Sequence, residues 1–207
     1  MNLFITNIYR APLQFFSVII AVGFSVCVHE FCHAWMAKKC GDNTAADAGH
    51  LTLNPLRQMG FLSIIMLLIL GFCWGAVPVN PANLSRKGRI AVSLAGPGAN
   101  LMLFAVGIIA GLIALRLWQW EGLFGVAITF AQINMVLFCI NIMPVPGFDG
   151  GQVLMEFIPR SKLYASEVGK GFMIGAMLLL FYCVGYIFSY SEWATRKVFI
   201  FCWELLS

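Results

Sequence analysis

Two of the chain's three histidines and one glutamate lie together in the pentapeptide HEFCH, residues 29–33. In an α-helix, residues i and i+4 share a face, so His29 and His33 direct their imidazoles to one place with Glu30 beside them. Neutral imidazole nitrogens are preferred zinc ligands, and a hydrolytic zinc site keeps one coordination position open for water. A carboxylate next to that water acts as a general base. The motif therefore predicts one zinc ion held by both histidines, with Glu30 as the catalytic base.

The motif stands at the end of a long apolar run that includes FFSVIIAVGFSVCV, residues 15–28. An ionisable side chain within a membrane-spanning helix costs about 2.5 kcal/mol or more. The H-E-x-x-H pattern also occurs by chance in helices that bind no metal. Two histidines and a glutamate, each unfavourable in a bilayer, are clustered in one apolar helix. This clustering favours a functional site over a chance occurrence of the motif.

A third metal ligand is expected next to another apolar segment, and Asp149 in NIMPVPGFDGGQV has that position. It follows an uncharged stretch that Pro144 and Gly147 bring to an end. Gly150 after it permits unusual backbone angles, so the aspartate can be presented from an unwound helix end. The alternative is that Asp149 caps a helix starting near Gln152. Given the two histidines, we favour the ligand.

Membrane helices are the elements that must position these residues. The chain is 60% hydrophobic and 11% charged, whereas soluble domains are about 25% charged. Four stretches reach the ~20 residues that cross a bilayer, namely 13–35, 90–115, 122–143 and 171–191. A fifth, 61–76, reaches only about 24 Å as a helix, short of the ~30 Å hydrocarbon core, which suits a re-entrant segment as well as a span. Residues 193–206 form either an interfacial helix or part of another span.

Topology gives an independent test of the fifth segment. If residues 61–76 cross the membrane fully, Asp149 emerges on the side opposite to His29 and His33; if they are re-entrant, all three meet. With a re-entrant segment, nine of the 13 basic residues lie in loops on the metal side, against six with a full crossing. These nine are Lys38, Lys39, Arg57, Arg86, Lys87, Arg89, Arg160, Lys162 and Lys170. Both tests favour a re-entrant segment, and the positive-inside rule places the site toward the cytoplasm.

Small and polar residues within the predicted helices indicate how they pack. Gly107 and Gly111 have the G-x-x-x-G spacing that lets two helices approach closely, and we interpret it as simple packing. Asn100, Asn134 and Asn141 lie at membrane depth and need hydrogen-bond partners there. The seven cysteines form no C-x-x-C pair and are expected to be small buried hydrophobic residues. The net charge of +4 is spread over loops, which excludes a nucleic-acid surface.

The peptide GHLTL, residues 49–53, predicts a short strand within a small membrane-associated β hairpin, and the Asn54-Pro55 turn ends it. A transmembrane helix must unwind before cleavage, because its peptide groups are engaged in internal hydrogen bonds. We expect the edge of this strand to receive unwound substrate by strand addition.

Five motifs in order, HEFCHAW, GHLTLNPL, VPVNPANL, SLAGPGANL and NIMPVPGFDGG, resemble the site-2 protease family of intramembrane zinc metalloproteases, in particular its compact bacterial members. The similarity extends over about residues 24–154. It implies zinc ligands at His29, His33 and Asp149, with Glu30 catalytic.

The resemblance also implies substrate-side residues. Asn141 matches a family asparagine that helps to hold the substrate or the oxyanion. His50 stands where many relatives have a basic residue, and it and Asn54 are weaker candidates for the same side of the site. The family's usual Leu-Asp-Gly is Phe148-Asp149-Gly150 here, a departure that affects the shape of the pocket and leaves the ligand unchanged.

We therefore expect an all-α polytopic membrane protein with about four transmembrane helices, a re-entrant segment and a short hairpin, in one domain over residues 1–207. The leading function is zinc-dependent cleavage of transmembrane protein substrates within or near the lipid bilayer of the cell membrane. Two alternatives stay open: a membrane zinc protease acting on surface or misfolded segments, and a non-hydrolytic zinc-binding protein, in which Glu30 would have no use. Whether the chain pairs with another subunit or with itself is left open.

Overall fold

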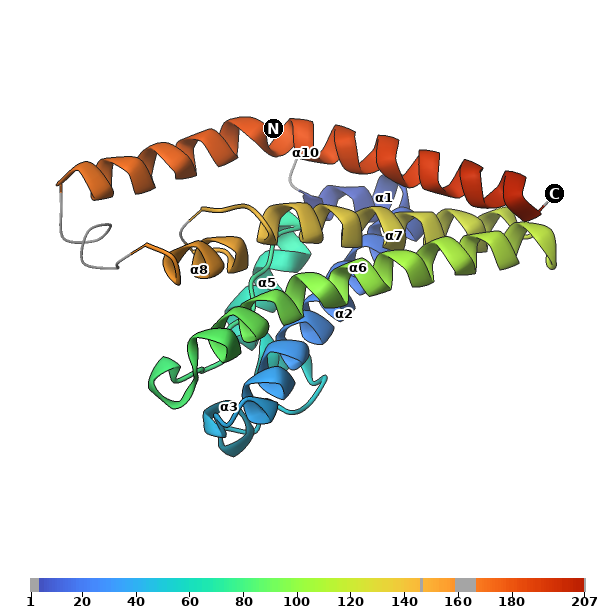
Figure 1. Ribbon diagram of the computed structural model, residues 1–207. Helices are drawn as coiled ribbons and strands as arrows, with labels where there is room; N and C mark the ends of the chain where they lie inside the picture. Colours follow the sequence, from blue (N-terminus) through green and yellow to red (C-terminus); the bar gives the residue numbers. More distant parts are fainter. Residues whose placement is uncertain (1–3, 146, 159–166, 207) are drawn as a thin grey trace.

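A computed structural model describes residues 4–145, 147–158 and 167–206. Three of its helices are long and apolar enough to cross a membrane: α2 (Pro12–Lys39), α6 (Arg86–Arg116) and α7 (Glu121–Asn141). α6 and α7 run side by side, and α2 packs against both where it crosses them (Figure 1). The chain is thus an all-α, multi-pass membrane protein, as predicted.

The fourth predicted span lies in α10 (Glu167–Leu206), a helix of 40 residues that follows the long axis of α7 (Figure 1). Residues 193–206 continue this helix without a break, so they form no separate interfacial element. The shorter helices are η1 (Phe4–Thr6), α1 (Asn7–Arg10), α3 (Thr44–Asp47), α4 (Pro55–Gln58), α5 (Gly60–Leu70), η2 (Pro81–Asn83) and α8 (Asp149–Met155). Arg160 and Lys162, which entered the loop-charge comparison, lie outside the described residues.

Local signals determine where the long helices begin and end. Pro12 occupies the first position of α2, where its missing N–H costs no hydrogen bond. Lys38 and Lys39 lie in the last turn of that helix, where positive charge is favourable. Ser85 caps α6, its Oγ accepting a hydrogen bond from the Gly88 N–H at 3.1 Å. Close packing then joins α6 to α7, because a Cβ on Gly107 would lie 2.8 Å from the Ala131 Cβ.

The fifth apolar segment folds back on itself. α5 has 11 residues, about 16 Å of helix, and is shorter than a span. After it, residues 72–80 form no helix and return alongside it: the Ser63 hydroxyl both donates to the Trp74 carbonyl (2.6 Å) and accepts from the Trp74 N–H (2.8 Å). The Ala76 N–H then reaches the Gln58 carbonyl at 3.1 Å, just before α5 begins. The two ends of the segment therefore lie together, which is the geometry that a re-entrant segment requires.

The strand predicted for residues 49–53 and its hairpin are not observed, and no strand occurs among the residues that the structure describes. The fully buried Gln58 explains the difference. Its Nε2 donates to the carbonyl oxygens of His50 (2.8 Å) and Thr52. Because one amide side chain satisfies these carbonyl groups, this loop needs no neighbouring strand.

A fully buried carboxylate ties the loop after α2 to the loop before α6. Asp42 Oδ1 accepts hydrogen bonds from the Thr44 N–H and hydroxyl and from Asn83 Nδ2 (2.9 Å), while Oδ2 accepts from the Asn80 N–H (2.7 Å). Burial by itself would raise the pKa of Asp42, but the hydrogen bonds from Thr44, Asn83 and Asn80 outweigh it and lower the pKa to about 2.

We predict that Asp42→Ala lowers the free energy of unfolding by about 2–4 kcal/mol, since four hydrogen bonds to a buried carboxylate are lost. The folded-state pKa lies below the unfolded value, so this contribution is complete above about pH 3.9 and is lost as the pH falls through about 2. Thermal unfolding in detergent at neutral pH measures the loss. Asp47→Ala, at an exposed position on α3, is the control, and equal melting temperatures for the two variants would contradict the prediction.

Candidate active site

Two helices bring the three predicted metal ligands together. α2 carries His29 and His33 on one buried face, and α8 begins at Asp149. The two histidine Nε2 atoms are 3.0 Å apart, and Asp149 places Oδ2 3.1 Å from the first and Oδ1 3.3 Å from the second. One ligand atom from each residue lies within 4.8 Å of the others, a spacing that can hold a metal ion.

α6 orients both imidazoles. His29 Nδ1 lies 2.7 Å from Asn100 Oδ1, and His33 Nδ1 lies 2.7 Å from the Val92 carbonyl oxygen. Both partners are acceptors, so each Nδ1 carries the hydrogen and donates it. In a neutral imidazole the other nitrogen is then unprotonated. Both Nε2 atoms therefore present lone pairs toward each other and toward the Asp149 carboxylate.

This donor set fits a cation. Two nitrogen lone pairs and a carboxylate converge at 3.0–3.3 Å and would repel one another without a positive charge between them. Asp149 Oδ2 is buried and has no hydrogen-bond partner among the described residues. Zinc prefers imidazole and carboxylate ligands in tetrahedral geometry, and three protein ligands leave a fourth position open. The residues present thus fit zinc.

A glycine allows α6 to lie directly over the ligands. A Cβ on Gly96 would touch His33 Nε2 and lie 2.5 Å from His29 Nε2. Only a hydrogen atom leaves room for the imidazoles at this point of the helix. The SLAGPGANL motif therefore combines the close approach at Gly96 with the acceptor at Asn100.

A buried chain of polar side chains continues from the site into the protein. Asn100 Nδ2 donates to Asn134 Oδ1 at 3.1 Å, and Asn134 Nδ2 donates to Ser25 Oγ and to the Phe130 carbonyl, both at 2.9 Å. All three side chains are fully buried, so α6, α7 and α2 are joined by satisfied polar contacts. We did not single out Ser25 from the sequence, although its place four residues before His29 on the same face of α2 was a usable signal.

Glu30 lies beside the ligands in a cavity of about 1290 Å³. Its side chain is buried and faces the non-helical residues 72–80. Gly75 is in contact with it, because a Cβ there would lie 2.5 Å from Glu30 Oε1. The carboxylate is therefore shielded by backbone on one side and open to the cavity on the other.

The three weaker candidates for substrate binding, Asn141, Asn54 and His50, do not all lie at the cavity. Asn141 lines the cavity and donates from Nδ2 to the Leu137 carbonyl at 2.9 Å. Asn54 caps α4 by accepting from the Leu56 N–H at 3.0 Å, and His50 Nδ1 lies 3.3 Å from Gln58 Oε1. Among the described residues, neither Asn54 nor His50 lines the cavity.

Asp149 is not a helix cap, the alternative role that its sequence position allowed. Phe148 occupies the cap position, and Asp149 is the first residue of α8, so Asp149 lies within the helix and is not its cap. Gly150 follows in close contact with the Ile142 carbonyl group, where a Cβ would clash with backbone. The end of α7 and the start of α8 can therefore approach closely, and Asp149 is directed to the histidines.

A buried H-E-x-x-H helix, an aspartate brought in from a second helix, and apolar spans around them define a class of protein: the multi-pass membrane zinc metalloproteases. Comparison with known sequences identifies the family. Residues 17–117 match the model of peptidase family M50, and the chain belongs to this family, which includes the site-2 proteases.

Similar proteins share most of their length with this chain. It is 34% identical over 177 residues to YwhC of Bacillus subtilis, covering 79% of this chain and 80% of that one. It is 34% identical over 188 residues to Rip2 of Mycolicibacterium smegmatis, covering 82% and 70%, and 33% identical over 147 residues to MJ0611 of Methanocaldococcus jannaschii, covering 69% and 71%. All three carry the name of a zinc metalloprotease. No solved structure matches the chain.

The predicted family and enzyme class are thereby confirmed. The chain is a zinc-dependent metalloprotease embedded in the lipid bilayer, and its substrates are proteins.

Proposed function

We propose that the protein is an intramembrane endopeptidase that hydrolyses peptide bonds of transmembrane proteins within or near the bilayer, and that residues 1–207 act as one domain with one zinc ion. The observation that carries this proposal is the meeting of two histidine lone pairs and the Asp149 carboxylate next to Glu30. The helices that surround them are long enough to span a membrane. The cavity at this point is lined mainly by apolar residues, which suits an apolar substrate segment.

In this proposal, His29, His33 and Asp149 hold the zinc. Bound zinc supplies Lewis acidity, which polarises a carbonyl group and makes a water molecule more acidic. Asn100 and the Val92 carbonyl keep the two imidazoles oriented through their Nδ1 hydrogens. Such contacts fix the ring positions before a substrate arrives.

Glu30 is the general base and then the general acid. Its carboxylate takes a proton from the attacking water as the water oxygen bonds to the scissile carbonyl carbon. It then delivers that proton to the amide nitrogen as the carbon–nitrogen bond breaks, leaving a carboxylic acid and an amine. In this proposal Asn141, which lines the same cavity, holds the substrate or the developing oxyanion. His50 and Asn54 have their described contacts in the loop around Gln58 and α4.

The unwound substrate segment pairs with residues 72–80. This part of the chain is not helical and lines the cavity beside Glu30. Strand addition needs free backbone groups, and in the loop at residues 50–54 Gln58 already engages the carbonyl groups of His50 and Thr52. The edge predicted for residues 49–53 is thus replaced by another segment.

The active site faces the cytoplasm. The end of α2 that carries His33 also carries Lys38 and Lys39, and α6 begins close by with Arg86 and Lys87. Positive charges gather in cytoplasmic loops of membrane proteins.

The test compares one cleavable sequence in two forms, as a transmembrane helix in mixed micelles and as a soluble unfolded peptide, with purified zinc-loaded protein. We expect cleavage of the membrane-inserted form, and its loss when a zinc chelator is added. Cleavage of the soluble form alone would contradict the intramembrane proposal and favour a protease that acts on surface or misfolded segments. Zinc binding without cleavage of any form would favour the non-hydrolytic alternative.

A further inference from the structure

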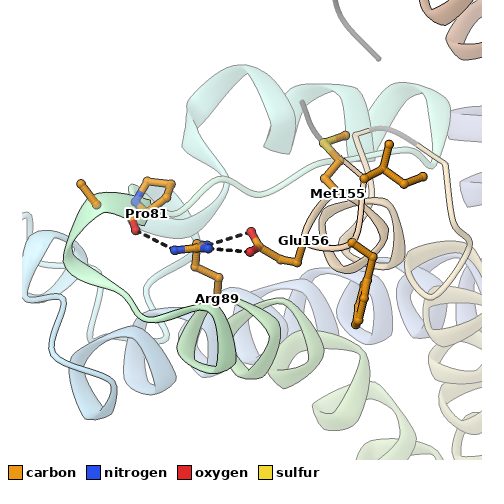
Figure 2. A pocket seen from close by; sticks show the side chains of 7 residues that line it. Pro81, Arg89, Met155 and Glu156 are labelled. Atoms are coloured by element: carbon orange, nitrogen blue, oxygen red, sulfur yellow. Dashed lines mark hydrogen bonds and ion pairs between the residues drawn. The ribbon is translucent and has the colours of Figure 1, made fainter. Parts of the chain in front are cut away.

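An arginine and a glutamate form a bidentate ion pair at the edge of the active-site cavity (Figure 2). Arg89, in the first turn of α6, donates from Nε to Glu156 Oε1 at 2.8 Å and from Nη2 to Oε2 at 2.7 Å. The Glu156 side chain is 8% exposed. Both carboxylate oxygens are engaged by one planar guanidinium, the geometry that lysine cannot reproduce.

The third guanidinium nitrogen binds a different part of the chain. Arg89 Nη1 donates to the Leu84 carbonyl at 2.8 Å. The same nitrogen approaches the Pro81 carbonyl at 3.5 Å, the contact drawn in Figure 2. Pro81 is the first residue of η2, which directly follows residues 72–80, and Leu84 is the residue after η2. One side chain on α6 therefore holds both the loop that leads from the Glu30 contact and the end of α8.

The pair stands at a boundary between two cavities. Pro81, Arg89 and Glu156 line the active-site cavity and also a second cavity of about 510 Å³. The remaining lining residues of this second cavity are Ala82, Met155, Phe157 and Ile158. Met155 is buried at this end of α8, and the ion pair adds a directional restraint to that packing.

α8 transmits this restraint to the metal site. Asp149 is its first residue, and Glu156 follows its last residue. The helix has seven residues, about 10 Å, and helices this short do not hold together in isolation. Its position therefore depends on tertiary contacts, which include packing against α6, the Gly150 contact with Ile142 at one end and the Arg89–Glu156 pair at the other.

We propose that Arg89 and Glu156 are positioning residues for the metal centre: their ion pair fixes α8 against α6 and thereby holds Asp149 in place beside His29 and His33. This inference rests on the proposed role of Asp149 as a ligand. Neither residue takes part in the chemical steps, and both act through the aspartate. α6 then orients all three ligands, two by hydrogen bonds to their imidazoles and the third by this pair.

The test uses full-length protein in detergent and the variants Arg89→Lys, Arg89→Met and Glu156→Gln, with Lys87→Met as the control. Lys87 is an exposed basic residue in the same turn of α6. Zinc affinity is measured by competition with a chelator. Protein loaded with saturating Co²⁺ gives a visible absorption spectrum that reports the ligand geometry. We expect about 10- to 100-fold weaker zinc binding in all three variants and an altered Co²⁺ spectrum, as for other residues that support metal ligands, and no change in the control.

A double variant with the charges exchanged, Arg89→Glu with Glu156→Arg, separates positioning from general damage. It restores the ion pair but not the bond to Leu84, so we expect partial recovery of zinc affinity and of the Co²⁺ spectrum. Unchanged affinity and an unchanged spectrum in Arg89→Met would overturn the inference. So would a loss of affinity with a native Co²⁺ spectrum, since that indicates destabilisation only. None of these measurements uses cleavage, so a native chain that binds zinc but cuts no substrate would refute the proposed function alone.

Discussion

Glu30→Gln is expected to slow peptide-bond cleavage by about 10²- to 10⁴-fold, the usual contribution of a general base or acid, with one zinc ion still bound per chain. Glutamine has nearly the same shape as glutamate, so it fits the buried space against Gly75. It cannot take a proton from water or return one to the leaving amine. The three metal ligands are separate side chains, so their zinc affinity is expected to change little.

The measurement is the single-turnover rate on a membrane-inserted substrate, together with the zinc content of the same preparation. Glu121→Gln, an exposed position at the start of α7, controls for the loss of one negative charge. Native cleavage by the Glu30 variant would exclude Glu30 as the base. Loss of zinc along with activity would show instead that the carboxylate supports the metal site.

Gly96→Ala is expected to weaken zinc binding by about two orders of magnitude and to abolish cleavage with it. The added methyl group would lie against His33 Nε2 and 2.5 Å from His29 Nε2 and Cε1, well inside ordinary contact distance. α6 has little freedom to retreat, since it also provides the Val92 and Asn100 acceptors for the same two imidazoles. Either the ligands move or their hydrogen bonds break.

Gly98→Ala is a matched control for this effect. It lies two residues further along α6, and a Cβ there meets nothing within 4 Å. Alanine is better than glycine in a helix by about 1 kcal/mol, so this variant is expected to keep its zinc and to be as stable as the native chain or more so. Zinc content and melting temperature, measured for both variants, check the prediction. Retention of native zinc affinity by Gly96→Ala would show that α6 does not lie where the structure places it.

Residues 72–80 show why part of the site could not be predicted. We treated residues 61–76 as one apolar segment because apolar composition alone does not indicate where its helix ends. α5 ends at Leu70, and Gly71, at its C-cap, adopts a left-handed conformation (φ 72°). The Ser63 hydroxyl then binds the returning backbone at Trp74. The strand predicted at residues 49–53 was wrong for a related reason. The side chain of Gln58 satisfies the carbonyl groups of His50 and Thr52, and such a contact has no signature in sequence.

By itself, the sequence determined the membrane helices and the residues able to bind metal. Apolar length sets a span, because the bilayer excludes polar backbone, and the i, i+4 spacing of His29 and His33 sets a common helical face; both properties are local. Only the tertiary structure decided how those ligands are held. The acceptor for His33 is a backbone carbonyl, which every residue possesses, and the ion pair of Arg89 with Glu156 joins residues 67 positions apart. Contacts of this kind arise from packing between helices, so they become visible only when the helices are placed together.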